Sequence, residues 1–152
     1  MCDETVRRHG AVPNWATCLI AGNEQLTADT VCLTVEAPAV AAAASAGQFV
    51  HIGVAEREAS DPFLRRPISL AAIDPARGTI GLVVRAIGRG TRQLAALQRG
   101  ARVDILGPVG RGFPETYAGR VILVGGGVGA APLLPLAAKL SAGCDSHLAQ
   151  TK

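Results

Sequence analysis

Aromatic and charged side chains are both scarce in this chain. Phe, Trp and Tyr make up 3% of its 152 residues, and Asp, Glu, Lys and Arg together make up 18%. The net charge is only +3, and the basic residues do not gather in the dense clusters that a nucleic-acid-binding face requires. We therefore expect no nucleic-acid partner.

The cysteines are few and widely spaced. Cys2, Cys18, Cys32 and Cys144 include no CxxC pair, whereas zinc and iron–sulfur sites usually contain such close spacings. The sequence thus offers no metal ligands. Residues 1–15 also lack the apolar core of a secretory signal, so we expect reduced thiols and a cytoplasmic location.

One uncharged segment, residues 121–138, approaches the length of a membrane-spanning helix. Glycines and prolines interrupt it at positions 125, 126, 127, 129, 132 and 135. Such residues break a helix and indicate a strand, a tight loop and then a helix. We expect the strand over residues 121–124, the helix over about residues 131–140, and no membrane partner.

The first two thirds of the chain are typical of a β-structure. Residues 30–36 alternate, with Val31, Leu33 and Val35 on one face, which is the period of a half-buried strand. Turn residues separate six such segments, so a small antiparallel barrel or a sandwich is predicted. The expected strands are residues 15–21, 30–36, 49–54, 68–73, 79–86 and 102–106.

A short helix is expected between the last two strands. Thr91 is a suitable N-cap, Leu94 and Leu97 share one face, and Gly100 ends the segment. This helix would close one end of the barrel. The alanine-rich residues 39–46 are interpreted as a loop or an irregular turn.

The tail has a different pattern from the rest. A strand without alternation, such as residues 121–124, is expected to be covered on both faces, as in a parallel α/β sheet. A doubly wound domain needs repeated βαβ units, and the sequence begins only one. We expect a mainly β protein, with a barrel over residues 13–113 and an incomplete α/β segment over residues 119–152. That tail should pack on the barrel, pair with another chain or fray.

Three glycine- or arginine-rich segments lie at the ends of expected strands. In "RRPISL", Pro67 forces Arg66 into an extended conformation, which suits a guanidinium that clamps a phosphate. "VVRAIGRGT" ends a strand with Arg85 and leads through glycines into the short helix, where backbone N–H groups favour a pyrophosphate. "GPVGRGF" allows close approach of the backbone to a ligand. The alternative for each is an ordinary turn.

Together, "AGQFVHI", "RRPISL", "VVRAIGRGT", "GPVGRGF" and "LVGGGVGAAPLLPLA" resemble, in order and spacing, the ferredoxin-reductase-like flavoproteins. In the residues of these motifs they are most similar to the electron-transfer subunits of class 1B dihydroorotate dehydrogenases. The resemblance implies a six-stranded Greek-key barrel that binds FAD, followed by an NAD-binding α/β domain. It implies an oxidoreductase of pyrimidine biosynthesis whose partner is a dihydroorotate dehydrogenase catalytic subunit.

The resemblance also assigns residues. The flavin and its phosphate would lie on Arg66, Pro67, Ile68 and Ser69, and the next strand would contact FAD through Val83, Val84 and Arg85. Backbone and hydroxyl contacts to the pyrophosphate would come from Gly90 and Thr91. The phosphates of NAD(H) would approach Gly125, Gly126, Gly127 and Gly129. On this resemblance no side chain is needed as a catalytic nucleophile, because the cofactor carries the redox chemistry.

The sequence departs from the family in its tail. The later strands of the NAD domain and the clustered cysteines that hold a [2Fe–2S] centre are not found, so that centre is implied by the family but has no ligands here. Two other hypotheses stay open. One is an NAD(P)H:flavin reductase or the reductase component of another oxidoreductase, and the other is a truncated barrel that transfers no electrons.

Overall fold

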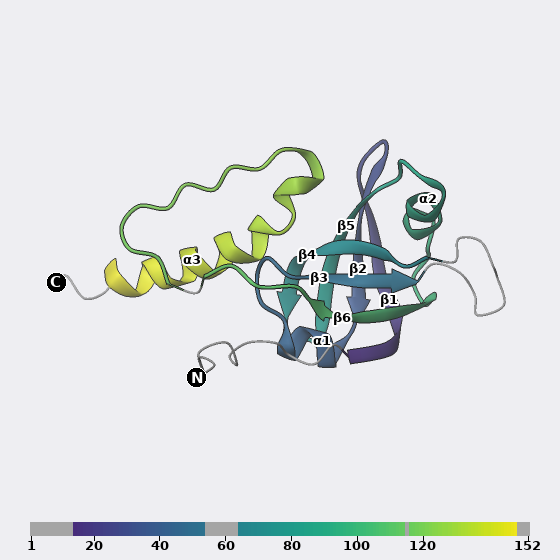
Figure 1. Cartoon of the computed structure of the whole chain (residues 1–152), viewed down its shortest axis with the longest axis horizontal. Helices are drawn as coiled ribbons and strands as arrows, with labels where there is room; N and C mark the ends of the chain where they lie inside the picture. The colour runs from purple at the N-terminus through teal and green to yellow at the C-terminus, as the bar shows by residue number, and fades with distance from the viewer. Residues whose placement is uncertain (1–13, 54–63, 115, 149–152) are drawn as a thin grey trace, which may run out of the picture.

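The computed structural model of the chain describes residues 14–53, 64–114 and 116–148. In this part, six strands close into a barrel in the order β1-β2-β5-β4-β3-β6, and every neighbouring pair is antiparallel (Figure 1). This confirms the predicted barrel and excludes the sandwich. The strands are β1 (Asn14–Thr27), β2 (Thr30–Glu36), β3 (Phe49–Gly53), β4 (Arg66–Asp74), β5 (Thr79–Arg85) and β6 (Arg102–Val109).

The barrel interior is filled by aliphatic side chains from alternate strand positions. In β2, Val31, Leu33 and Val35 are at most 3% exposed, while the residues between them are half-buried. A strand places successive side chains on opposite faces, so the alternation in sequence becomes a wall with one apolar side. Burial of that side drives closure of the barrel.

Two short helices cover the barrel. The helix α1 (Pro38–Ala43) buries Val40 and Ala41, so the loop expected over residues 39–46 is wrong. Alanine is the best helix former and proline suits the first helical turn, and a buried valine then provides tertiary packing. The helix α2 (Arg89–Ala95) closes one end of the barrel with Leu94, which is fully buried.

The start of α2 differs from the prediction by one turn. The N-cap is Gly88, and Thr91 lies at the third helical position. The Thr91 hydroxyl still caps the helix, because its Oγ1 accepts the Gly88 N–H at 3.0 Å. The helix ends at Ala95. Gly100, which has a φ of +86°, lies in the turn between this helix and β6.

The tail contains no strand among its described residues. Residues 121–126 are irregular, with Ile122 78% and Val124 85% exposed, so the strand expected over residues 121–124 is wrong. A strand is held by a hydrogen-bonded neighbour, and none lies beside this segment in the described part. The 3₁₀-helix η2 (Gly127–Ala130) and the helix α3 (Leu133–Leu148) follow.

The expected helix is present, although it begins at Leu133 and extends to Leu148 instead of ending near residue 140. Its first turns lie against β4 while the rest of the helix extends away from the barrel, and η2 lies beside β5 (Figure 1). Ala131 and Leu136 are each 4% exposed, so the tail packs on the barrel, which was the first of the three expectations. Among the described helices, none has the length and apolar character needed to cross a membrane.

Candidate functional site

Two neighbouring strands of the barrel separate near the site predicted from sequence. The strands β4 and β5 pair from Asp74↔Thr79 as far as Leu70↔Leu82. Beyond that point, β4 continues to pair with β3, through Ile52↔Arg66, and β5 continues to pair with β2. Among the described residues, no pair joins Arg66–Ser69 to Val83–Arg85. Each of these strand segments therefore has a backbone edge whose N–H and C=O groups need another partner.

The side chains beside this gap follow the strand alternation. Leu70 is fully buried in the core and Ile68 packs against it, so Pro67 and Ser69 face outward. On β5, Val84 is 1% exposed, and Val83 faces outward. Of the residues expected at the flavin, Ile68 and Val84 thus offer their backbone, while Pro67, Ser69 and Val83 also offer their side chains.

Arg66 and Gly90 are in direct contact. A Cβ atom placed on Gly90 would lie 2.6 Å from Arg66 Nε and 2.9 Å from its Nη2. The guanidinium also donates from Nη1 to the Leu64 carbonyl oxygen at 2.6 Å. Because only glycine leaves room for this approach, the first turn of α2 and the first residue of β4 form one cationic, glycine-lined corner.

Thr91 completes the same corner from within α2. Its hydroxyl accepts the Gly88 N–H at 3.0 Å and donates to the Gly88 carbonyl oxygen at 3.1 Å. Both bonds hold the turn that carries Gly90 against Arg66. The structure therefore brings Arg66, Gly90 and Thr91 together, as the sequence predicts.

Arg85 has a bound partner that sequence reasoning missed. Its Nε donates to Asp29 Oδ2 at 2.7 Å, and Asp29 is the turn residue just before Thr30, which pairs with Arg85 in the β2–β5 ladder. Thr30 and Thr27 donate to the other oxygen of Asp29 at 2.9 and 3.0 Å. The hydrogen bond from Arg85, followed by those from the two threonines, lowers the pKa of Asp29 to about 2. No local pattern marks Asp29, because the strand register alone places it beside Arg85.

The glycine-rich loop lies near the barrel rather than apart from it. Gly125 packs so closely under Ala130 that a Cβ would lie 2.8 Å from the Ala130 Cα, and Gly127 has φ of +54°. These two positions need glycine for the shape of the loop. Gly126 and Gly129 are exposed, with open space where a side chain would stand. Since η2 contains Gly127 and Gly129 and lies beside β5, the loop is brought to the strand that borders the gap.

The turn "GPVGRGF" has a different role from the one predicted. A Cβ on Gly107 would lie 2.6 Å from Val50 Cγ1, and one on Gly110 would lie 2.9 Å from the Phe49 ring. The buried Gln48 amide donates to the Gly110 carbonyl oxygen at 2.8 Å. These glycines therefore allow close approach of the chain to itself, where we expected close approach to a ligand.

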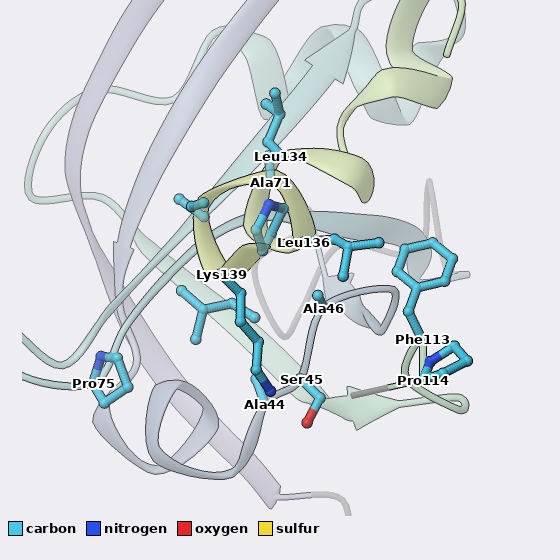
Figure 2. A pocket seen from close by; sticks show the side chains of 14 residues that line it. Ala44, Ser45, Ala46, Ala71, Pro75, Phe113, Pro114, Leu134, Leu136 and Lys139 are labelled. Carbon is cyan, nitrogen blue, oxygen red and sulfur yellow. The ribbon is translucent and has the colours of Figure 1, made fainter. Parts of the chain in front are cut away.

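A cavity of about 650 Å³ lies between α3, β4 and the segment before β3 (Figure 2). Most of its lining is apolar, including Leu136 and Phe113, with Ser45 and Lys139 as the polar side chains. It contains none of the residues predicted for the site. We place the candidate site at the β4–β5 gap, because its polar backbone edges and cationic corner point to a charged ligand, whereas the cavity is the space beneath the docked helix.

The described residues do not provide a metal centre. Among them, no group of three His, Cys, Asp or Glu side chains lies close enough to hold an ion. Burial, and to a lesser extent nearby carboxylates, raises the pKa values of the Cys18 and Cys32 thiols. A [2Fe–2S] cluster is usually held by four cysteine thiolates, and Cys18 and Cys32 are the only thiols among the described side chains, so the described residues do not fit one.

Comparison with known proteins gives a consistent result. Residues 17–113 match the family model described as the oxidoreductase FAD-binding domain. The chain is 46% identical over 125 residues to the dihydroorotate dehydrogenase B (NAD(+)) electron transfer subunit of Geobacillus thermodenitrificans, covering 80% of this chain and 48% of that protein. The corresponding subunit of Shouchella clausii is 44% identical over 124 residues, with 80% and 47% covered.

The chain also resembles a solved flavoprotein structure. The NADH-dependent reduced ferredoxin–NADP oxidoreductase, described for flavin-based electron bifurcation, superimposes with a TM-score of 0.75 at 32% identity. The match covers 84% of this chain and 45% of that one. The chain thus spans about half the length of the curated relatives that it matches.

Proposed function

The chain belongs to the family of oxidoreductase FAD-binding domains, and on that premise we propose that it binds FAD where β4 and β5 separate and serves in electron transfer. The observation that carries the proposal is the corner formed by Arg66 and Gly90, beside two unpaired strand edges. A planar ring with polar edges fits those strand edges, and a diphosphate fits the guanidinium. FAD combines both groups in one molecule.

The residues at the gap have distinct roles in this proposal. Arg66 holds the pyrophosphate through its guanidinium, which can donate parallel hydrogen bonds to phosphate oxygens. The backbone at Gly90 allows the phosphates close to α2, while Thr91 keeps that turn in place. The backbone edges of Ile68, Ser69 and Val83 bond the flavin and orient it.

When bound, the flavin supplies one- and two-electron redox chemistry. The protein excludes water from one side of it and fixes its position. In its present contact Arg85 is turned toward Asp29, because its Nε is bound to Asp29 Oδ2. A guanidinium has five N–H donors, and this contact uses one, so we assign Arg85 a secondary contact to FAD.

We further propose that the glycine loop, Gly125–Gly129, forms part of a site for NAD(H). This corresponds to a barrel over about residues 13–113 and a nucleotide-binding segment over residues 119–152. Its support is the exposed backbone at Gly126 and Gly129, on a loop beside β5. Electrons would pass between that nucleotide and the flavin, whose proposed sites are on the adjoining elements η2 and β5.

The partner is proposed from the relatives. Both bacterial proteins described above are named electron transfer subunits of dihydroorotate dehydrogenase B (NAD(+)), so we propose a cytoplasmic hetero-oligomer with a dihydroorotate dehydrogenase catalytic subunit. No step is assigned to an iron–sulfur centre, since the described thiols do not fit one. A reductase component for a different acceptor is the second candidate, favoured by the likeness to the ferredoxin–NADP oxidoreductase.

Reconstitution tests the proposal. Purified protein is titrated with FAD, and binding is followed by the flavin absorbance and fluorescence. We expect saturable uptake in the wild type and about tenfold weaker binding in Arg66→Met, the loss of one charge-assisted phosphate contact. The matched control is Arg77→Met, because Arg77 is a highly exposed arginine whose ion pair with Asp74 lies at the other end of β4. Folded wild-type protein that takes up no FAD would refute the proposal.

A second experiment separates the two acceptors. Each candidate partner, a dihydroorotate dehydrogenase catalytic subunit or a ferredoxin, is mixed with the FAD-loaded chain and the complex is measured by analytical ultracentrifugation. If the chain is a dihydroorotate dehydrogenase electron-transfer subunit, a stable complex with the catalytic subunit is expected. Binding to ferredoxin alone would favour a reductase component for a different acceptor.

A further inference from the structure

We infer that Arg65 is a positioning residue, which anchors the chain before β4 so that the adjacent Arg66 is held against Gly90. The inference rests on the proposed function, because it concerns the arginine assigned to the FAD phosphates. It answers a question that the sequence raises, namely why two arginines precede Pro67 when one guanidinium suffices to clamp a diphosphate.

The anchor begins with Asp104, in the middle of β6. Arg65 Nη1 donates to the Asp104 carbonyl oxygen at 3.0 Å, and its Nη2 lies 3.9 Å from Asp104 Oδ2. Thr17 on β1 donates to Asp104 Oδ1 at 2.8 Å and holds the carboxylate in place. Asp104 also pairs with Gly53 of β3 in the sheet. A single side chain is thus tied to the wall formed by three strands.

Trp15 provides the second half of the anchor. The Arg65 Cζ atom lies 4.2 Å from the centre of the Trp15 ring, which is the geometry of a cation–π interaction. Trp15 is the chain's one tryptophan and is 65% exposed, so burial in the core does not explain its place in β1. Gly53 lies directly beside the guanidinium, since a Cβ there would lie 3.4 Å from Arg65 Nη1, an ordinary van der Waals contact.

The two arginines lie on opposite sides of the chain. Pro67 favours an extended conformation at Arg66, and consecutive side chains of extended backbone point in opposite directions. Arg65 therefore lies on the outer wall of the barrel while Arg66 reaches Gly90. With its cation paired to Asp104 and stacked on Trp15, and only 23% of its side chain exposed, Arg65 fixes the backbone from which Arg66 extends.

A double-mutant cycle on FAD affinity tests this role. Arg65→Met in the full chain is expected to raise the Kd for FAD about tenfold, because the phosphate-binding guanidinium is no longer held in place. In an Arg66→Met background, the same substitution should change Kd by less than about twofold, since the group it positions is gone. A merely structural role would weaken binding equally in both backgrounds, and that result would overturn the inference.

Trp15 supplies an independent pair of variants. Trp15→Phe keeps an aromatic face under Arg65 and should retain the affinity for FAD, whereas Trp15→Leu should weaken binding. Trp15 is exposed, so both proteins are expected to fold, and thermal unfolding checks this. Equal Kd values for the two variants would contradict the role of the ring. Arg102→Met is the matched control for charge, because Arg102 is an exposed arginine of β6 that pairs with Leu19 on β1.

The outcomes separate this inference from the proposed function. If the folded wild type takes up no FAD, the proposed function fails and the inference fails with it. If the wild type binds FAD and Arg66→Met weakens binding while Arg65→Met and Trp15→Leu do not, the proposed function stands and the positioning role is refuted.

Discussion

The guanidinium of Arg66 lies against the backbone of Gly90 so closely that a methyl group there would be 2.6 Å from Nε. This contact joins the start of β4 to the first turn of α2. It makes the end of the barrel into a cationic corner, and it leads to the first prediction.

Gly90→Ala should separate affinity from stability. The clash involves the far end of a flexible arginine, so the side chain can move aside at little cost, and alanine favours a helix over glycine by about 1 kcal/mol. We therefore expect an unchanged or raised free energy of unfolding together with about tenfold weaker FAD binding. Fluorescence titration and urea unfolding measure the two quantities.

The control for this variant is Gly22→Ala in β1. A Cβ there would lie 3.8 Å from the Thr34 Cβ, an ordinary van der Waals contact, so FAD affinity should not change. If Gly90→Ala binds FAD as tightly as the wild type, Arg66 does not need its present position.

Thr91 should contribute to stability through its hydroxyl. The hydroxyl bonds both the N–H and the carbonyl oxygen of Gly88, so Thr91→Val should lower the free energy of unfolding by about 1 kcal/mol. Thr91→Ser keeps the hydroxyl and should retain most of the free energy of unfolding. Urea unfolding followed by circular dichroism compares the three proteins, and equal midpoints for the valine and serine variants would contradict the capping role.

The pair Asp29–Arg85 should make stability depend on acidic pH. The pKa of Asp29 is lowered from 3.8 to about 2, chiefly by the hydrogen bond from Arg85. A carboxyl group whose pKa is lower in the folded state stabilises the protein above its ordinary pKa, and this stabilisation is lost as the pH falls toward the folded value.

Asp29→Asn removes that titration. We expect the wild type to lose more stability than the variant between about pH 4 and pH 2, with little difference in slope above pH 5. Urea midpoints measured across this range, at low and high salt, test the expectation. Parallel pH profiles for the two proteins would show that Asp29 is not paired in solution.

The docking of α3 on the barrel should depend on Leu136. Leu136 is 4% exposed, whereas Leu134, two residues earlier, is 52% exposed. Leu136→Ala removes buried contacts, so the amides of α3 should exchange with solvent faster while those of β2 keep their protection. Leu134→Ala is the matched control and should leave exchange unchanged. Equal exchange in the two variants would mean that α3 is not held by this contact.

Local patterns were sufficient for much of the barrel. The strand over residues 30–36 was expected from its alternation and the other five from short segments between turn residues, and all six are present, because the inside of a small barrel demands a period of two. The helix α1 was missed because alanine-rich sequence has no apolar periodicity, and only the burial of Val40 reveals its packing. The strand at residues 121–124 was wrongly expected, since an apolar segment cannot become a strand without a neighbour.

Arginines, glycines and a proline, in the right order, were enough to predict the corner that Arg66 forms with Gly90 and Thr91, while the binding of FAD there stays a prediction. Their contacts followed from the closed barrel: Arg66 meets Gly90, Arg85 meets Asp29 and Arg65 meets Asp104 because the strand register brings together residues far apart in the chain. Side-chain type and local spacing are properties of neighbouring residues, so they can be read along the chain. Which guanidinium is bound to Asp29 or Asp104, and which one borders the gap between β4 and β5, depends on long-range strand pairing, so only the tertiary structure decided it.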